Sequence, residues 1–119
     1  MTFNMLGLSD SLLHAVQKSG YTKPTLIQER AIPVILSGKD VMAAAQTGTG
    51  KTAAFALPTL HHLTQDGSKL QSMKPRALIL APTRELASQI SDSFRRYSRH
   101  RGLRSAVVFG GVSIRPQIK

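Results

Sequence analysis

The sequence has 119 residues and no cysteine, so it holds at most one small domain and excludes a disulfide framework or a thiolate metal site. It has neither a signal-peptide pattern nor an apolar run near the ~20 residues of a membrane span, so we expect a soluble, cytoplasmic protein with no membrane partner. The charge is uneven: five Lys and Arg oppose four Asp and Glu up to Ser68, and eleven oppose two from Lys69 onward. The basic second half favours a polyanionic partner, with a merely solvated helix face as the alternative.

The first predicted element is an amphipathic helix from Ser9 to Ser19. Leu12 and Val16 recur on one side of this stretch at helical spacing, which predicts one buried face. Gly20 follows at the position where a glycine commonly ends a helix.

A second helix is predicted to begin after Thr25 and to end near Gly38, with an interruption or kink at Pro33. Pro24 keeps the residue before it out of the helical region, and Gln28 follows Thr25 at the spacing of a capping box. From local sequence, two roles stay open for the Gln28 amide. It can bond back to the Thr25 N–H, or it can pair with the polar edge of an adenine.

The stretch from Ala45 to Thr52 reads Ala-Gln-Thr-Gly-Thr-Gly-Lys-Thr, after a predicted strand that starts at Lys39 and before a helix predicted to run to about Leu63. Its glycines let backbone N–H groups turn toward a phosphate, and the helix start adds the positive end of its dipole. Lys51 is expected to reach the β- and γ-phosphates, and the Thr52 hydroxyl to ligate Mg²⁺. The strict motif begins with glycine, so we interpret the stretch as a variant phosphate-binding loop; the alternative is a turn without a ligand.

Two histidines and a polar loop come next. His61 and His62 have no second ligand group at a matching spacing, so we expect surface groups or partners of the helix C-terminus and not metal ligands. The polar stretch from Thr64 to Pro75 predicts a surface loop.

Two further apolar runs, Arg76 to Ala81 and Ser105 to Phe109, predict strands of the kind buried in a parallel sheet. Between them, apolar residues at helical spacing predict a helix in which Phe94 and Tyr97 belong to the core and do not stack on bases. Gly102 is expected to close this helix.

Strands alternate with helices, which predicts parallel βαβ units with ligands at the carboxyl ends of the strands. The phosphate loop, Pro82 to Glu85 and Gly110-Gly111 each follow a strand. We therefore expect all three segments at the same edge of one sheet.

Taken in order, these stretches resemble the DEAD-box family of ATP-dependent RNA helicases, and within it the bacterial RhlE type, over the whole chain. Phe3, Gly20-Tyr21 and Pro24 to Gln28 look like the Q motif, Ala45 to Thr52 like motif I, Pro82 to Ala87 like motif Ia, and Gly110-Gly111 like the GG motif. The resemblance implies an α/β fold: a partial RecA-like P-loop NTPase domain with a parallel sheet flanked by helices. It divides the chain into a Q-motif region, residues 1–38, and a segment with the P-loop, motif Ia and GG motif, residues 39–119.

The same resemblance implies ATP and Mg²⁺ as cofactors and RNA as partner, with Tyr21 stacking on adenine and Gln28 reading its polar edge. Lys51 and Thr52 are then the catalytic residues, and Thr52 is also the metal ligand. The implied nucleotide-binding residues are Tyr21, Lys23, Gln28, Ala45, Gln46, Thr47, Gly48, Thr49, Gly50, Lys51 and Thr52. The implied contacts with the RNA backbone are Pro82, Thr83, Arg84, Gly110 and Gly111.

Some parts of the family pattern have no counterpart here. None of the six acidic residues ends an apolar run after the phosphate loop, and the Asp-Glu-Ala-Asp motif, the Ser-Ala-Thr motif and the second RecA-like domain are absent. We therefore expect a domain truncated before the DEAD-motif strand, with apolar strand edges that favour aggregation. Because phosphoryl transfer to water needs a carboxylate on Mg²⁺, we expect no ATP hydrolysis from these residues alone.

Two other functions are compatible with parts of the sequence. A non-catalytic basic RNA-binding fragment would bind with a steep salt dependence and would be indifferent to Lys51→Ala. A different P-loop class, such as a GTPase or a small-molecule kinase, gives Gln28 no part, and the Asn-Lys-x-Asp element of a GTPase is absent. The sequence carries no signal for a particular assembly, such as the ribosome or an RNA-decay complex.

Overall fold

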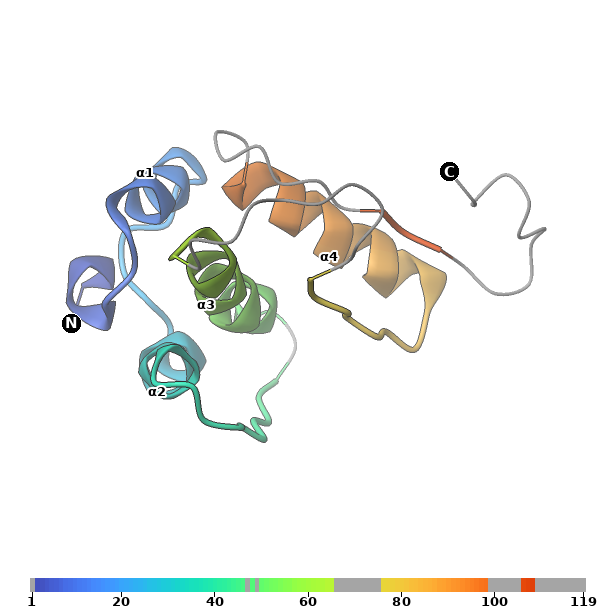
Figure 1. Cartoon of the computed structure of the whole chain (residues 1–119), viewed down its shortest axis with the longest axis horizontal. Helices are drawn as coiled ribbons and strands as arrows, with labels where there is room; N and C mark the ends of the chain where they lie inside the picture. The colour runs from blue at the N-terminus through green and yellow to red at the C-terminus, as the bar shows by residue number, and fades with distance from the viewer. Residues whose placement is uncertain (1, 47, 49, 66–75, 99–105, 109–119) are drawn as a thin grey trace.

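The computed structural model describes residues 2–46, 48, 50–65, 76–98 and 106–108 (Figure 1). Its elements in chain order are η1 (Phe3–Leu6), α1 (Asp10–Lys18), α2 (Leu26–Leu36), α3 (Lys51–Gln65) and α4 (Arg84–Tyr97). The central helix α3 packs against α2 and α4, and α1 packs against α4. Figure 1 shows α3 and α4 running in the same general direction. Within the described ranges, no helix is long and apolar enough to cross a bilayer.

The predicted helices are confirmed, but α4 ends at Tyr97 and not at Gly102, which lies outside the described residues. The ends of α1 and α2 follow from local chemistry. Gly20 adopts φ +86° after α1, and its N–H donates to the Gln17 carbonyl at 3.0 Å. The Tyr21 N–H donates to the Val16 carbonyl at 3.2 Å, which completes a Schellman motif. The same motif ends α2, where Gly38 has φ +84°. Both turns reverse the chain sharply and so set the direction of the next segment.

Pro33 does not interrupt α2, contrary to one of the two outcomes predicted for it. The helix continues to Leu36, and the Ser37 N–H donates to the Pro33 carbonyl at 3.1 Å. Pro33 is exposed, so its ring lies on the solvent side of the helix. Pro33 has no N–H to donate to the carbonyl of Glu29, so the helix lacks one interior bond, a loss that the packing of its buried face must offset.

The core lies between the helices. Its most buried members, each at most 5% exposed, are Phe3, Leu6, Leu12, Val16, Ala31, Ile32, Ala53, Ala54, Ala56, Leu57, Leu60 and Tyr97. The rings of Phe55 and Phe94 meet with centroids 6.2 Å apart, which joins α3 to α4. The prediction that Phe94 and Tyr97 belong to the core is confirmed.

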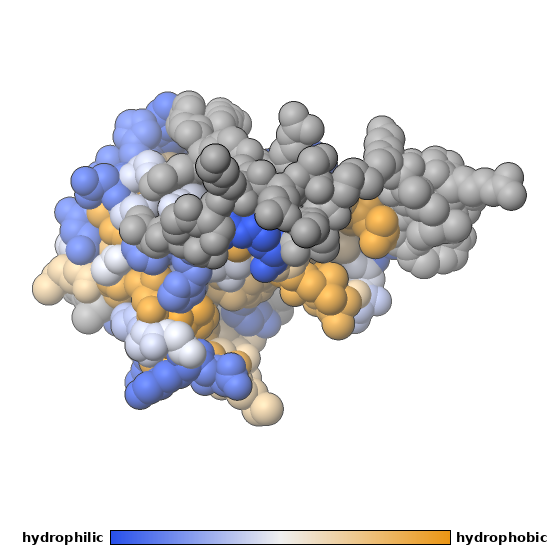
Figure 2. Space-filling view, viewed as in Figure 1, coloured by the Kyte–Doolittle hydropathy of each residue, from blue (hydrophilic) through white to orange (hydrophobic). Residues whose placement is uncertain are grey.

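The predicted parallel sheet is not formed in the described part of the chain, where no strand is assigned. Residues 39–46 and 76–82 run as extended segments, and their large apolar side chains face solvent: Met42 is fully exposed, and Leu78 and Leu80 are 83% and 84% exposed. Apolar residues accordingly reach the surface beside hydrophilic ones (Figure 2). A strand needs a ladder of backbone hydrogen bonds to a neighbouring strand and an apolar cover. The described residues form no such ladder, and the side chains of Met42, Leu78 and Leu80 have no cover there. Most of the third predicted strand, beyond 106–108, lies outside the described residues.

Candidate functional site

The segment from Ala45 to the start of α3 forms a loop that depends on glycine. Gly48 and Gly50 have φ +81° and +82°, a region that residues with a Cβ rarely adopt. The first helical bond of α3 runs from the Ala54 N–H to the Gly50 carbonyl at 3.2 Å, so the helix begins immediately after the second glycine. The free N–H groups of a helix start, next to an exposed Lys51, are the groups that bind anions.

Gln28 ties this loop to the start of α2. Its side chain is 1% exposed, its Oε1 accepts from the Thr25 N–H at 3.0 Å, and its Nε2 donates to the Gly50 carbonyl at 3.1 Å. A Cβ on Gly50 would collide with that same Nε2. Gly50 is thus required by its backbone conformation and by the close approach of Gln28.

The bond from Gln28 back to Thr25, one of the two roles that the sequence left open, is present. The reciprocal half of the capping box is in place but weak: the Thr25 hydroxyl lies in capping position over the Gln28 backbone, yet it is buried with no hydrogen-bond partner of good geometry. The Gln28 amide keeps one N–H and one lone pair beyond its two bonds. Its pairing with adenine stays a prediction, and it requires the base to reach a nearly buried group.

A cavity of about 440 Å³ opens between the first turn of α2 and the loop. It is lined by Thr25, Leu26, Ile27, Arg30, Ala44, Ala45 and Gly48. This volume falls within the range of small-molecule sites, and Arg30 is the charged member of the described lining. The sequence analysis did not predict Arg30 as a site residue. Its position two residues after Gln28, in the same turn of α2, could have indicated it.

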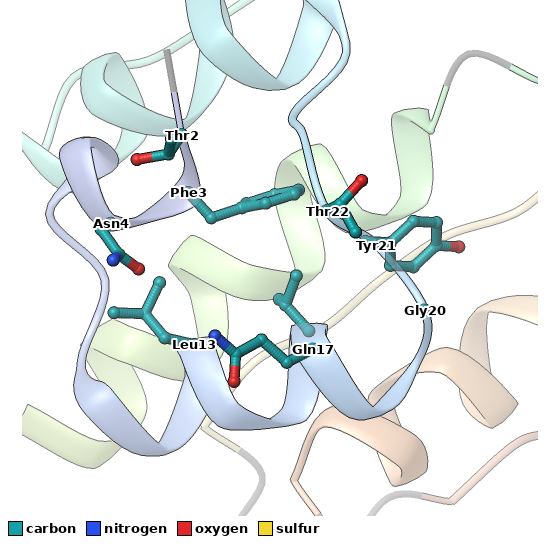
Figure 3. Close-up of a pocket in the computed structure, with 9 residues that line it drawn as sticks. Thr2, Phe3, Asn4, Leu13, Gln17, Gly20, Tyr21 and Thr22 are labelled. Carbon is teal, nitrogen blue, oxygen red and sulfur yellow. The ribbon is translucent and has the colours of Figure 1, made fainter.

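Tyr21 lies on a different hollow, of about 310 Å³, beside η1 and α1 (Figure 3). The residues that line it are Thr2, Phe3, Asn4, Leu13, Val16, Gln17, Gly20, Tyr21 and Thr22. None of the described lining residues is shared with the cavity beside the loop. The structure therefore brings Gln28, Gly50 and the loop together, and it places Tyr21, 41% exposed, at a neighbouring surface.

The remaining predicted site residues fall into three groups. Lys23, Gln46 and Lys51 are exposed, while Ala45 and Thr52 are half-buried. Thr47, Thr49, Gly110 and Gly111 lie outside the described residues, so the predicted common edge with the GG segment is not tested. Pro82, Thr83 and Arg84 are exposed at the start of α4.

Thr83 has a local role that the sequence analysis did not assign. It is the N-cap of α4, and its hydroxyl accepts from the Leu86 N–H at 3.1 Å. Such a cap satisfies one of the free donors of the first turn. Arg84 follows as the first helical residue, with its side chain exposed.

The two histidines near the end of α3 link this helix to other elements through hydrogen bonds. His61 Nδ1 accepts from the Ser9 N–H at 3.2 Å, and His62 Nε2 lies 2.9 Å from the Ile35 carbonyl. A carbonyl only accepts, so His62 carries its proton on Nε2. Both rings therefore serve the packing of α3 against the ends of α1 and α2. The described residues hold no group of three or more potential metal ligands.

Comparisons with known proteins agree with these features. Residues 25–119 match the family model described as DEAD/DEAH box helicase. The chain is 50% identical over 119 residues to the ATP-dependent RNA helicase CshA of Limosilactobacillus reuteri, covering 100% of this chain and 23% of that protein. It is 53% identical over 112 residues to the ATP-dependent RNA helicase SrmB of Escherichia coli (strain K12), covering 94% of this chain and 25% of that protein. The chain thus spans about a quarter of the length of these relatives.

Solved structures show the same relationship in three dimensions. The RNA-helicase Prp28 from Chaetomium thermophilum, bound to ADP, matches with a TM-score of 0.85 and 41% identity, over 98% of this chain and 28% of that one. A DEAD box protein from Methanococcus jannaschii matches with a TM-score of 0.83 and 41% identity, over 98% of this chain and 31% of that one. The backbone course is therefore that of part of a RecA-like domain.

Proposed function

Because this chain belongs to the DEAD/DEAH box helicase family, we propose that it is the part of an ATP-dependent RNA helicase that binds ATP and the RNA backbone. The observation that carries the proposal is the loop before α3. Two glycines with positive φ precede Lys51 and Thr52, and Gln28 holds the carbonyl of the second glycine. A strand-to-helix turn without a ligand has no need of a lysine and a threonine directly after that glycine.

The loop fits a triphosphate with Mg²⁺. The exposed Lys51 ammonium supplies a positive charge for the β- and γ-phosphates, and the N–H groups of the first turn of α3 supply donors. Thr52 is the residue that would hold Mg²⁺, through its hydroxyl. Since Mg²⁺ keeps several waters and binds through substrate phosphates, one protein oxygen suffices for binding. The metal would neutralise charge that develops between the β- and γ-phosphates.

Binding without hydrolysis is the activity that we propose for these residues. Hydrolysis also needs a carboxylate on the metal and a group that orients the attacking water. Glu29 and Glu85 stand in the first turns of α2 and α4, and neither lines the cavity beside the loop. For a full-length helicase that contains this segment, we propose that it acts in the cytoplasm and that ATP binding and hydrolysis drive local unwinding of RNA duplexes.

RNA contact is proposed at the start of α4, through Pro82, Thr83 and Arg84, together with Gly110 and Gly111. Arg84 is exposed beside the N-terminus of α4, where helix N–H groups and a guanidinium are both suited to phosphate. The net charge of +10 supports the same partner. It equally supports a basic RNA-binding fragment that takes no nucleotide, and the experiment below separates the two.

The test measures binding of Mg²⁺-ADP and of a short single-stranded RNA to the full chain by calorimetry. Lys51→Ala is expected to weaken ADP binding at least about tenfold, because it removes the charge beside the phosphates. Lys39→Ala is the matched control, since Lys39 is also exposed but follows α2 outside the loop. RNA affinity that falls steeply with salt, together with no ADP binding by the unmodified chain, would replace this proposal with the nucleotide-independent fragment.

A further inference from the structure

Two stripes of side chains run along α4, and they differ in charge. Residues four, three and four positions apart return to nearly the same side of a helix. The arginine stripe consists of Arg84, Ser88, Ser91 and Arg95. The acidic stripe consists of Glu85, Gln89, Asp92 and Arg96. The arginine stripe has no acidic member, whereas two acids outnumber the single arginine of the acidic stripe.

The arginine stripe lies at the border between solvent and the core. Arg84, Ser88 and Arg95 are exposed, so their polar groups can meet a ligand from solution. Ser91 is 8% exposed, and its Oγ has no hydrogen-bond partner in the described part of the chain. The stripe is thus open at both ends and at Ser88, and its deepest member is a hydroxyl with unused hydrogen-bonding capacity.

The spacing of the two arginines suits a chain of phosphates. Arg95 follows Arg84 by eleven positions, which places its Cα about three turns, or about 16 Å, further along the helix axis. Guanidinium and serine hydroxyl groups both donate to phosphate oxygens, and such contacts do not depend on base sequence. A strand of phosphates that meets Arg84 can therefore follow the stripe past Ser88 to Arg95.

A simpler role is open to Arg95 and Arg96 alike, since both stand in the last turn of α4. Cations there stabilise a helix by offsetting the negative end of its dipole. Asp92 also neighbours both, three positions before Arg95 and four before Arg96. A difference between the two arginines toward a polyanion must therefore come from the stripe on which each one stands.

We propose that the arginine stripe binds the sugar-phosphate backbone of a single RNA strand, and that Arg95 is a further RNA-binding residue. This inference rests on the proposed function, because it extends the RNA contact proposed at Arg84. Continuity with that contact identifies RNA as the occupant, and the acidic stripe keeps the strand to one side of the helix through repulsion. Each contact adds affinity by releasing counterions from the RNA.

The test measures binding of a labelled uridylate dodecamer to the full chain by fluorescence anisotropy at several salt concentrations. Arg95→Ala is expected to weaken binding about fivefold at low salt. It is also expected to reduce the slope of log affinity against log salt by about 0.7, which corresponds to one lost phosphate contact on a single strand. Arg95→Lys keeps the charge and should keep the slope.

Arg96→Ala is the matched control. It removes the same charge from the same turn of α4, but from the acidic stripe. We expect it to change the affinity by less than about twofold and to leave the salt slope unchanged. Circular dichroism of both alanine variants checks that α4 is retained, since both lose a favourable interaction with the helix dipole.

The outcomes separate this inference from the function on which it rests. If the unmodified chain binds no RNA, the proposed RNA contact fails and this inference fails with it. If Arg84→Ala weakens binding while Arg95→Ala has no more effect than Arg96→Ala, the contact at the start of α4 stands and the stripe is overturned. Polyglutamate that binds as tightly as the RNA, with the same loss in Arg95→Ala, would assign the stripe to acidic proteins and overturn the proposal as well.

Discussion

Leu57 and Leu80 are the same residue type in one small chain, yet Leu57 is 0% exposed and Leu80 is 84% exposed. Leu57 lies in α3, which is covered by α2 on one side and by α4 on the other. Leu80 lies in the extended segment 76–82, where its side chain has no cover in the described part of the chain, although the neighbouring Ala81 packs against the core. The difference teaches that hydrophobicity selects a residue for burial, but that burial needs a second surface of matching shape.

The largest expected effect comes from truncating the covered leucine. Leu57→Ala removes a fully buried side chain and is expected to lower the free energy of unfolding by about 2–5 kcal/mol, enough to unfold a marginal domain. Leu80→Ala is the matched control, and we expect it to change that free energy by less than about 0.5 kcal/mol. Urea unfolding followed by circular dichroism measures both. Equal losses would mean that segment 76–82 is packed in solution.

The exposed leucines also allow the comparison to be tested by solubility. Leu78→Lys with Leu80→Lys places charges on an uncovered apolar segment, which is a common way to block edge-to-edge association. We expect less aggregation of the chain in light scattering, with helix content unchanged. Unfolding of the helices in this variant would contradict the independence of the two regions.

The next largest effect is expected at the two loop glycines. Gly50 lies against the Gln28 side chain of α2, whereas Gly48 has no such neighbour. Gly50→Ala places a Cβ against Gln28 and strains a backbone at φ +82°, so we expect a loss of about 2–3 kcal/mol in unfolding free energy. Gly48→Ala meets no atom within 4 Å and is expected to cost only about 1 kcal/mol, from the positive φ alone. Urea unfolding of both variants measures the difference. If the two losses are the same, the Gln28 contact contributes nothing to stability.

The smallest effect is expected where the extended segment 76–82 leads into α4. Thr83→Ala removes the hydroxyl that accepts from the Leu86 N–H, and we expect it to cost about 1 kcal/mol. Thr83→Ser keeps the hydroxyl and should restore most of that loss, while Ser88→Ala, at an exposed position of the same helix, should be neutral or slightly stabilising. Thermal unfolding measures all three. A loss that serine does not restore would assign the effect to the methyl group and not to the cap.

The sequence was a reliable guide where structure depends on neighbours along the chain. Gly20 closes the helix Asp10–Lys18 from just beyond its end, and Gln28 bonds to Thr25 at capping-box spacing. Both were predictable because these contacts join residues a few positions apart. The loop at Gly48 and Gly50 was predictable for the same reason. The second bond of Gln28, to the Gly50 carbonyl, was not predicted, since it joins α2 to a loop that no local pattern connects with it.

By itself, the sequence determined where α1 and α2 begin and end, which helix faces are apolar and where the glycine loop before α3 turns, since spacing, caps and glycine conformations act over a single turn of chain. Tertiary structure alone decided that His61 and His62 join the ends of two other helices, that Gln28 bonds to Gly50, and that Met42, Leu78 and Leu80 stay exposed. The physical reason is that a helix satisfies its own backbone, whereas a strand and a side-chain contact across the core need a partner that only the folded chain can supply.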